Sequence, residues 1–258
     1  MSYPVHPEKH RLPALLTAEQ MIEFRRAHGL RETHAPEGVV LCLYRGVMRR
    51  FGWNYRAKRV DGFQADVYLL RRRDRRVGVV GNFGIGAPAA TNLAEELIAW
   101  GAKRLVILSL GGGLQPQLAP GSLVLCDRAV RDEGTSYHYL PPARDVAASA
   151  ALVARISRAM DARALAHVTG ATWSTDAPYR ETREEAASYQ SEGVQTVDME
   201  SAGVFAAAQV RGVDAASVLI VGDSLAGPRW SAPPDMRALH RRIETLLDTL
   251  IDVVSDVS

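Results

Sequence analysis

A pair of acidic residues has a type and spacing suited to chemistry on a sugar. Asp198 and Glu200 flank Met199, where an apolar run meets a stretch of small residues typical of a helix. A buried carboxylate is costly unless it accepts hydrogen bonds, and a sugar diol offers one carboxylate two adjacent hydroxyl donors. A helix N-terminus, where backbone N–H groups and the dipole favour acids, is the structural alternative.

A third acid, Asp223, follows the apolar run 219–221 and precedes Ser224. An aspartate at a strand end in a cleft can have a raised pKa and donate a proton to a leaving group. A turn or N-cap aspartate would have the same local sequence, so both interpretations stay open.

Two glycine-rich segments could let a ligand approach the backbone. Gly84 and Gly86 precede Pro88 and a predicted helix, where backbone N–H groups can bind an anion, although a tight strand-to-helix turn explains them equally well. This segment lacks the third glycine and the downstream acid of a dinucleotide fingerprint, which excludes NAD. Gly112, in the run 111–113, could lie against a ligand or serve a flexible turn.

The remaining candidate ligand contacts are aromatic and polar. His138, in the polar segment 131–139, could act as an acid or base near neutral pH, although a lone histidine is more often structural. An aromatic and polar rim for a planar heterocycle is predicted after another strand, with packing as the alternative for part of it; its members are Trp173, Asp176, Tyr179 and Arg180.

Alternating elements must position these residues. Apolar runs predict strands at residues 39–43, 77–80, 105–110, 122–125, 166–173 and 215–221. Helical spacing and end signals predict helices at 18–28, 90–100, 146–160, 200–210 and 236–254. The basic run 71–76 indicates a hairpin turn. This alternation predicts an α/β fold: a single-domain three-layer α/β/α sandwich around a central twisted, mostly parallel sheet. Four polar or glycine-rich segments follow such strands, where ligands bind in these sheets.

Composition limits the class of protein. The chain has 258 residues, 47% of them apolar, and a net charge of +2, enough for one sizeable core and without an argument for a nucleic-acid or membrane partner. Cys42 and Cys126 lie in apolar runs and are expected to be buried thiols, so no metal site is expected. The polar N-terminus and short apolar runs favour a cytoplasmic enzyme. Residues 1–35 are expected to form an arm with a short helix, and 36–258 the α/β domain.

In order along the chain, these segments resemble the nucleoside phosphorylase and nucleosidase superfamily, on the uridine phosphorylase side. The resemblance runs from about residue 84 to 230; its parts are Gly-Ile-Gly-Ala-Pro at 84–88, Gly-Gly-Leu-Gln at 112–115, Pro-Gly at 120–121, Arg-Asp-Glu-Gly-Thr-Ser at 131–136, Asp-Met-Glu at 198–200 and Gly-Asp-Ser at 222–224. It implies cleavage of an N-glycosidic bond through an oxocarbenium-like transition state, by phosphate or by water.

The resemblance also implies roles for single residues. Glu200 matches the family's ribose-diol carboxylate and Met199 the methionine on the sugar. Asp223 matches the aspartate with which purine-specific members protonate the base. No cofactor is implied, phosphate being a possible co-substrate. The implied partner is a small nucleoside, and the implied assembly is a homo-oligomer, from dimer to hexamer.

Departures from the family pattern concern phosphate. Ile107 and Leu110 stand where phosphorylases carry an arginine and a threonine, and a dianion without such ligands would be underpaired. Gly84, Gly86, Arg45 and Arg131 are the candidate residues for a degenerate phosphate site, with Arg49 as a further arginine. The Gly-Asp-Pro turn is absent, Asp198 shortens the usual first glutamate, and His6 and His10 are uncertain counterparts of a histidine from a neighbouring subunit.

Three functional hypotheses therefore remain open: a phosphorylase with an altered phosphate site, a phosphate-independent nucleoside hydrolase or another enzyme reusing the nucleoside pocket, and a non-catalytic nucleoside-binding protein. The retained Glu200 and Asp223 argue against the third hypothesis, and Ile107 and Leu110 argue against the first.

Overall fold

A computed structural model describes residues 6, 8–32, 34–72, 75–232 and 235–256. The strands are β1 (Gly38–Cys42), β2 (Lys58–Val60), β3 (Asp66–Arg72), β4 (Arg75–Gly81), β5 (Arg104–Gly113), β6 (Leu123–Asp132), β7 (Asp145–Ala147), β8 (His167–Thr175), β9 (Thr196–Asp198) and β10 (Asp214–Ser224). The α-helices are α1 (Ala18–Ala27), α2 (Arg45–Met48), α3 (Phe51–Asn54), α4 (Ala87–Trp100), α5 (Ala150–Asp161), α6 (Arg183–Ser191), α7 (Ser201–Arg211) and α8 (Met236–Ser255). Short 3₁₀ helices are η1 (Lys9–Arg11), η2 (Ser136–His138) and η3 (Pro178–Arg180).

The ten strands form one mixed sheet that partly closes on itself. The path β10-β6-β8-β9-β5-β1-β4-β3-β2 is joined by a further pairing of β10 with β5, so five strands make a ring. Strands β4, β1, β5 and β10 are parallel neighbours, whereas β9 runs antiparallel to β5. The α/β class is confirmed, but the sheet is less parallel than predicted, because β10 also runs antiparallel to β6 and the edge strands β2, β3 and β4 pair antiparallel.

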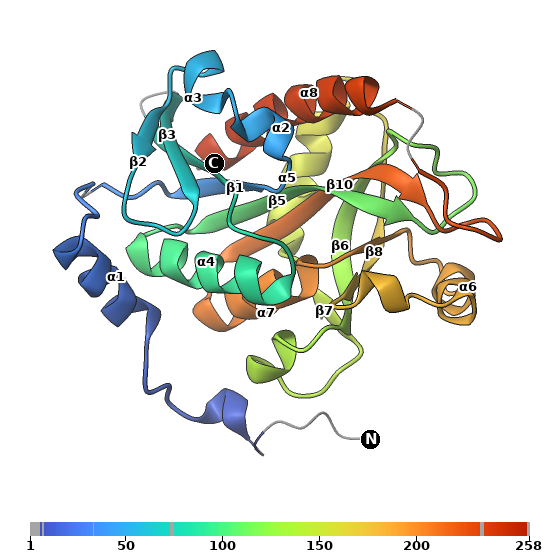
Figure 1. The fold of residues 1–258 in the computed structure, drawn as a ribbon, viewed down its shortest axis with the longest axis horizontal. Coiled ribbons are helices and arrows are strands. Elements are labelled where there is room, and N and C mark those ends of the chain that lie inside the picture. Colours follow the sequence, from blue (N-terminus) through green and yellow to red (C-terminus); the bar gives the residue numbers. More distant parts are fainter. Residues whose placement is uncertain (1–5, 7, 33, 73–74, 233–234, 257–258) are drawn as a thin grey trace.

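Helices cover the sheet on two sides (Figure 1). The long amphipathic α8 buries Leu246, Leu247 and Leu250 in one hydrophobic cluster, to which α5 adds Ile156. On the other side α4 and α7 bury small and aliphatic side chains against β1, β5 and β10. Small residues on α7 allow close packing: a Cβ added to Gly203 would lie 2.6 Å from Thr91 Oγ1 of α4.

Local signals explain where several helices begin. Thr17 and Gln20 form a capping box at α1, Thr182 and Glu185 form another at α6, and Asp235 caps α8. Each of these side chains satisfies backbone N–H groups that the first helical turn leaves unpaired.

The predicted elements are present, but several differ in extent. Strand β6 runs to Asp132, beyond the predicted end at 125. Strand β5 continues through the three glycines 111–113 instead of ending before them. Residues 145–147 form β7, and α5 begins only at Ala150, so the helix predicted over 146–160 is wrong in its first turn. Strands β3 and β4 pair as a hairpin, so four residues of the turn predicted over 71–76 lie in strands, and residues 73–74 lie outside the described residues.

The N-terminal segment runs along the body as an arm (Figure 1). Its helix α1 packs Ile22 into the core, and Arg25 forms an ion pair with Glu96 of α4 at 2.7 Å. Farther along the arm, η1 contacts η2. In the described part of the chain no helix is long and apolar enough to cross a membrane.

Candidate active site

Glu200 is a buried carboxylate at the junction of β9 and α7. Its side chain is 4% exposed. Oε1 accepts a hydrogen bond from the Gly86 backbone N–H at 2.7 Å, and Oε2 accepts one from the Met199 N–H at 3.3 Å. Burial, followed by the negative charge of Asp198, raises the pKa of Glu200 to about 7. The carboxylate is therefore held in place while its ionisation is made difficult.

Asp198 supports this junction from within the protein. Its Oδ1 accepts from Ser174 Oγ at 2.6 Å, and its Oδ2 accepts from the Ser201 backbone N–H at 2.9 Å and from the Ser201 hydroxyl. Burial raises the pKa of Asp198 as well. Because its oxygens are engaged by β8 and α7, Asp198 is placed to position Glu200; a direct contact of Asp198 with substrate stays a prediction.

The loop before α4 forms one wall beside Glu200. Gly86 adopts a φ of +90°, a conformation that favours glycine, and a Cβ at this position would lie 3.9 Å from Met199 Cε. Met199 is half-buried there. The structure thus brings together three predicted residues, Gly86, Met199 and Glu200, although the Gly86 N–H is donated to Glu200, which removes it from the donors expected for an anion.

Asp223 lies near the end of β10, where that strand pairs with Gly112 of β5. Its Oδ2 accepts a hydrogen bond from Trp230 Nε1. Trp230 is held by a loop closed through two Ser224–Ser231 backbone hydrogen bonds of 3.0 Å each. The indole therefore fixes one oxygen of Asp223.

Gly112 is required by close packing in the β5 strand. A Cβ on Gly112 would lie 2.5 Å from Leu225 Cδ1, 2.8 Å from Val197 Cγ1 and 3.5 Å from Asp223 Oδ1. The expected flexible turn is absent, and the missing side chain instead lets β9 and the loop after β10 approach the same point. This approach links the Asp198–Glu200 segment to Asp223.

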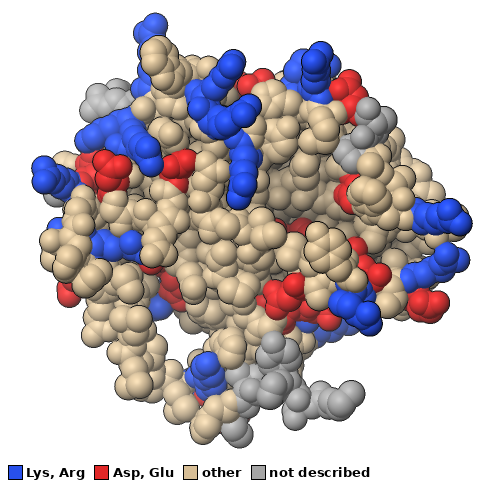
Figure 2. Space-filling model, viewed as in Figure 1, with Lys and Arg blue, Asp and Glu red and all other residues tan. Residues whose placement is uncertain are grey.

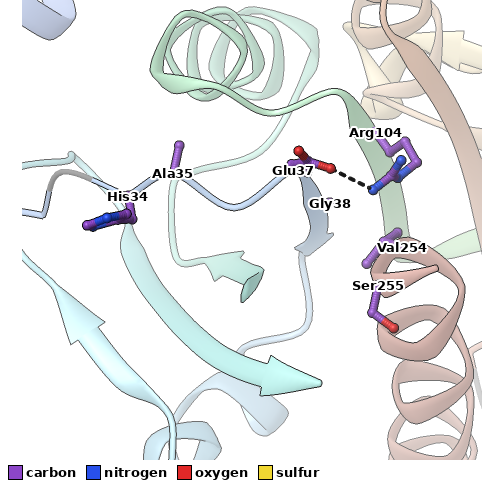
Figure 3. Close-up of a pocket in the computed structure, with 7 residues that line it drawn as sticks. All are labelled: His34, Ala35, Glu37, Gly38, Arg104, Val254 and Ser255. Carbon is purple, nitrogen blue, oxygen red and sulfur yellow. Dashed lines mark ion pairs between the residues drawn. The ribbon is translucent and has the colours of Figure 1, made fainter. Parts of the chain in front are cut away.

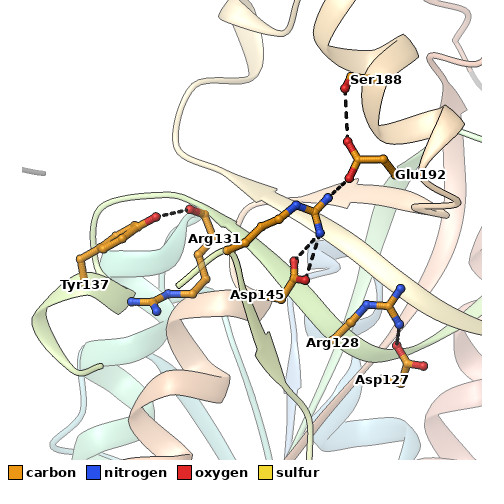
Figure 4. A network of polar contacts seen from close by, with 8 residues as sticks. Asp127, Arg128, Arg131, Tyr137, Asp145, Ser188 and Glu192 are labelled. Atoms are coloured by element: carbon orange, nitrogen blue, oxygen red, sulfur yellow. Dashed lines mark hydrogen bonds and ion pairs between the residues drawn. The ribbon is translucent and has the colours of Figure 1, made fainter. Parts of the chain in front are cut away.

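Arg131 organises the loop 131–141. Its Nε donates to Ser136 Oγ at 2.8 Å, and Nη1 donates to the Pro141 carbonyl at 2.7 Å. Tyr137 lies under the guanidinium and donates its hydroxyl to the Arg131 carbonyl at 3.0 Å (Figure 4). The candidate phosphate ligand is thus buried and donates to a hydroxyl and a carbonyl of its own loop.

Neighbouring polar residues reinforce that loop from outside. Arg144 forms ion pairs with Asp145 and Glu192, which ties β7 to the end of α6 (Figure 4). His138 lies on the exposed side of the loop, where its Nδ1 is 2.9 Å from Lys9 Nζ of the arm. Burial and the Lys9 charge lower the pKa of His138. The structure therefore places His138 against the arm.

The predicted aromatic rim is divided between core and surface. Trp173 is 0% exposed, packs against Tyr189 with the two rings tilted by 40°, and donates its indole N–H to Asp132 at 2.9 Å, so it belongs to the core rather than the rim. Tyr179 is fully exposed and Arg180 is exposed. Asp176 accepts from the Gly134 N–H at 2.8 Å and braces the loop 131–141.

The two residues that replace the family's phosphate ligands lie in apolar surroundings. Ile107 is 0% exposed within one hydrophobic cluster, and Leu110 is half-buried against the other. Gly84 is exposed with a φ of +101°. Arg45 is exposed at the start of α2, and no side-chain hydrogen bond or ion pair of Arg45 occurs within the described residues. Figure 2 shows the face hollowed below α2, with basic side chains above and acidic side chains along the lower border.

Two of the cavities lie elsewhere on the molecule. One of about 230 Å³ lies where β1 and β5 begin, lined by residues that include Glu37, Arg104 and Ser255, and the Arg104–Glu37 ion pair of 3.6 Å crosses it (Figure 3). Another lies beside Gly121 and the start of α8. Neither contains the Glu200 or Asp223 carboxylates. Among the described residues, no cluster of histidine, cysteine and acidic side chains could hold a metal ion.

Sequence reasoning missed two residues at this site, Trp230 and Glu181. Trp230 lies in a glycine- and proline-containing loop without periodicity, so nothing in the sequence pointed to its bond with Asp223. Glu181 follows η3, and burial, followed by the negative charge of Asp223, raises its pKa to about 7. An acid just after the predicted Tyr179–Arg180 rim was the available signal.

Comparisons with known proteins place the chain in a sequence family. The sequence model described as the phosphorylase superfamily matches residues 65–252. A uridine phosphorylase of Treponema pallidum is 29% identical over 149 residues, 54% of this chain and 58% of that protein. A guanosine phosphorylase of Halorubrum lacusprofundi is 32% identical over 157 residues, 59% of this chain and 64% of that protein. The chain thus matches about three fifths of the length of these relatives.

Solved structures share the fold. A uridine phosphorylase of Vibrio fischeri superposes with a TM-score of 0.73 at 22% identity, covering 88% of this chain and 97% of that one. An AMP nucleosidase of Bacteroides thetaiotaomicron superposes with a TM-score of 0.74 at 21% identity, covering 92% and 96%. The fold of this chain is therefore shared by solved structures. The family match over most of the chain is decisive: the protein belongs to the phosphorylase superfamily.

Proposed function

We propose that this protein is an enzyme that cleaves the N-glycosidic bond of a nucleoside and transfers the pentosyl group to phosphate. The observation that carries the proposal is Glu200, buried and aligned by the Gly86 N–H beside half-buried Met199. An ionised carboxylate so held can accept hydrogen bonds from both hydroxyls of a ribose diol. Those bonds strengthen as positive charge develops on the sugar in the transition state.

Asp223 is proposed to assist departure of the base. A nucleophile forms a bond to the anomeric carbon while the bond to the base breaks, and the electron pair of that bond goes to the base. Asp223 in its protonated form donates its proton to the departing base, a step that suits a purine. Its Oδ2 is fixed by Trp230, which favours Oδ1 for the ligand.

The nucleophile is proposed to be phosphate bound weakly. Ile107 and Leu110 supply no charge or donor, and the Gly86 N–H is already donated to Glu200. Arg45, exposed at the start of α2, is the first arginine to test as a replacement, followed by Arg49. Two lost hydrogen bonds to a charged group, about 1.5–3 kcal/mol each, weaken phosphate affinity by roughly two to four orders of magnitude.

Hydrolysis is the second candidate, and the same apolar Ile107 and Leu110 favour it. A water molecule needs no charged ligand set, so the carboxylates could act without phosphate. The two candidates share the sugar and base contacts and differ in the product: ribose 1-phosphate in one case and free ribose in the other.

The test is a panel of guanosine, inosine, adenosine and uridine assayed with and without phosphate, resolving ribose 1-phosphate from ribose. We expect base release from a purine nucleoside with ribose 1-phosphate as the product, and a phosphate dependence that does not saturate at sub-millimolar concentration. Free ribose formed at the same rate without phosphate would favour hydrolysis. A saturable phosphate dependence at sub-millimolar concentration would refute the weak phosphate site. An absence of base release from every nucleoside would leave the non-catalytic binding protein as the better account.

A further inference from the structure

The start of helix α7 is capped by neighbouring side chains instead of by its own N-cap residue. Glu200 occupies the N-cap position, but its side chain accepts no hydrogen bond from the first turn. Asp198 Oδ2 accepts from the Ser201 backbone N–H at 2.9 Å, and Ser174 Oγ accepts from the Ala202 backbone N–H at 3.0 Å. These two acceptors satisfy N–H groups that a first helical turn cannot bond internally.

Ser174 connects the two capping groups from β8. It is 0% exposed, and it lies opposite Asp198 in the parallel pairing of β8 with β9. Its hydroxyl donates to Asp198 Oδ1 at 2.6 Å while its oxygen accepts from the Ala202 N–H. A hydroxyl has a single hydrogen to donate, so this hydrogen is committed to Asp198. One side chain thus fixes both the carboxylate of Asp198 and the first turn of α7.

The capping by Ser174 has a consequence for Glu200. The Glu200 carboxylate turns away from its own helix, and Oε1 accepts from the Gly86 N–H at 2.7 Å. An acid at an N-cap is otherwise drawn to the N–H groups of the first turn and to the positive end of the helix dipole. Without the Ser174 hydroxyl, the Ala202 N–H would need another acceptor. The Glu200 carboxylate would then bond its own helix and leave the Gly86 N–H.

The other hydroxyls around Asp198 are arranged differently. Thr172 Oγ1 lies 3.4 Å from Asp198 Oδ1 and donates to the Thr196 carbonyl at 3.2 Å, within the sheet. The Ser201 hydroxyl donates to Asp198 Oδ2 from the helix itself. Among these described hydroxyls, Ser174 is therefore the one that links β8, β9 and the N-terminus of α7.

We propose that Ser174 is a positioning residue for the sugar: it caps α7 in place of Glu200 and so keeps the Glu200 carboxylate directed toward the ribose diol of a nucleoside. Ser174 acts through α7 and Asp198 and does not itself bind the substrate. This inference rests on the proposed function, because it uses the contact of Glu200 with the sugar.

The experiment uses two C-nucleosides, 9-deazainosine and its 2′-deoxy form. They differ in one hydroxyl of the diol and resist cleavage because carbon joins base to sugar. Dissociation constants are measured by calorimetry for the wild type, Ser174→Ala and the matched control Ser149→Ala. The Ser149 hydroxyl also accepts a backbone N–H, that of Ala215 at 3.0 Å, at the start of β10. Both variants therefore remove the acceptor of one backbone N–H, but only Ser174→Ala does so beside Glu200.

Chemical denaturation checks that each variant is folded. If Ser174→Ala does not fold, Ser174→Cys takes its place, because a thiol has a similar size and is a weak acceptor.

We expect the wild type and Ser149→Ala to bind 9-deazainosine about 10- to 100-fold more tightly than the 2′-deoxy compound, since one hydrogen bond to a carboxylate is lost. In Ser174→Ala the ratio should fall to about threefold or less, through weaker binding of 9-deazainosine, because the displaced carboxylate no longer meets the 2′-hydroxyl.

The outcomes separate this inference from the proposed function. A ratio that a folded Ser174→Ala protein leaves unchanged would overturn the positioning role alone. A Ser174-dependent ratio in a protein that cleaves no nucleoside would overturn the proposed activity alone. A wild-type ratio near one, or no binding of either compound, would overturn both the positioning role and the contact of Glu200 with the sugar.

Discussion

Glu200 is the residue on which the proposed chemistry depends, and its surroundings determine both its position and its pKa. Gly86 and Met199 hold its oxygens, and Asp198 lies on the same short segment. Asp198 has its own donors in Ser174 and Ser201. Asp198 therefore orients the junction between β9 and α7, while Glu200 remains the better candidate to bind the sugar.

This arrangement predicts a pH dependence. Glu200 accepts hydroxyl hydrogens only when ionised, and its pKa is raised to about 7, so kcat/KM should fall as the pH decreases below 7. Asp198→Asn removes the negative charge that contributes to this shift, and the acidic limb should move to lower pH by roughly one unit. The hydroxyls of Ser174 and Thr172 can rotate to accept from the new amide.

The control for that measurement is Glu181→Gln. Burial raises the pKa of Glu181 to about 7 as well, but Asp198 is not among the causes. If the ionisation of Glu181 caused the acidic limb of the kcat/KM profile, Asp198→Asn would leave that limb in place and Glu181→Gln would remove it. That pattern would contradict the assignment to Glu200.

At the scale of elements, the loop 131–141 shows how the structure changes an interpretation of the sequence. Arg131 resembled a phosphate ligand by its segment, yet its guanidinium donates to Ser136 and Pro141 and covers Tyr137. A loop with so many polar groups needs internal partners when it packs on β6 and β8. Sequence spacing alone does not say which carbonyls will meet a given arginine.

Arg131→Met should therefore act on stability. It leaves the Ser136, Leu140 and Pro141 acceptors unpaired in a partly buried loop, so the free energy of unfolding should drop by about 3 kcal/mol. Chemical denaturation measures this loss, and Arg45→Met serves as the control with an exposed arginine. A fully stable Arg131→Met protein with a greatly raised KM for phosphate would instead assign Arg131 to the phosphate site.

Much of the fold could be predicted from local sequence pattern. There are physical reasons why the remaining parts could not. Apolar runs such as 39–43 and 215–221 located central strands because both faces of those strands are buried. The pattern did not reveal β9, which has three residues, or the closure of the sheet, which depends on pairing across long separations. For the site, Glu200 and Asp223 followed from the family pattern, whereas Trp230 and Glu181 required tertiary contacts.

At the scale of the whole molecule, the N-terminal arm carries an apolar surface. Leu12, Leu15, Leu16 and Phe24 are exposed, although α1 is tied to the body by Arg25 and Glu96. Several exposed large apolar side chains on one extension are typical of an interaction surface. The homo-oligomer expected from the sequence remains a prediction, and this surface is where it can be tested.

Leu15→Glu should weaken self-association. Leu15 is fully exposed, and a charge buried at an interface is costly unless it is paired. Light scattering over a range of concentrations should show an oligomer for the wild type and a shift toward smaller species for the variant. Ala151→Glu, an exposed site on α5, should leave the assembly unchanged. A wild-type monomer at every concentration would exclude this role for the arm.

The most direct test of the whole account is the rate of base release from the best nucleoside of the panel, compared between wild type, Glu200→Gln and Glu184→Gln. The amide keeps the size of Glu200 but cannot accept from both diol hydroxyls, so kcat/KM should fall by about 100- to 1,000-fold. Circular dichroism should report an unchanged fold, and Glu184→Gln should retain wild-type activity. Near-normal kcat/KM in a folded Glu200→Gln enzyme would contradict the claim that Glu200 holds the sugar.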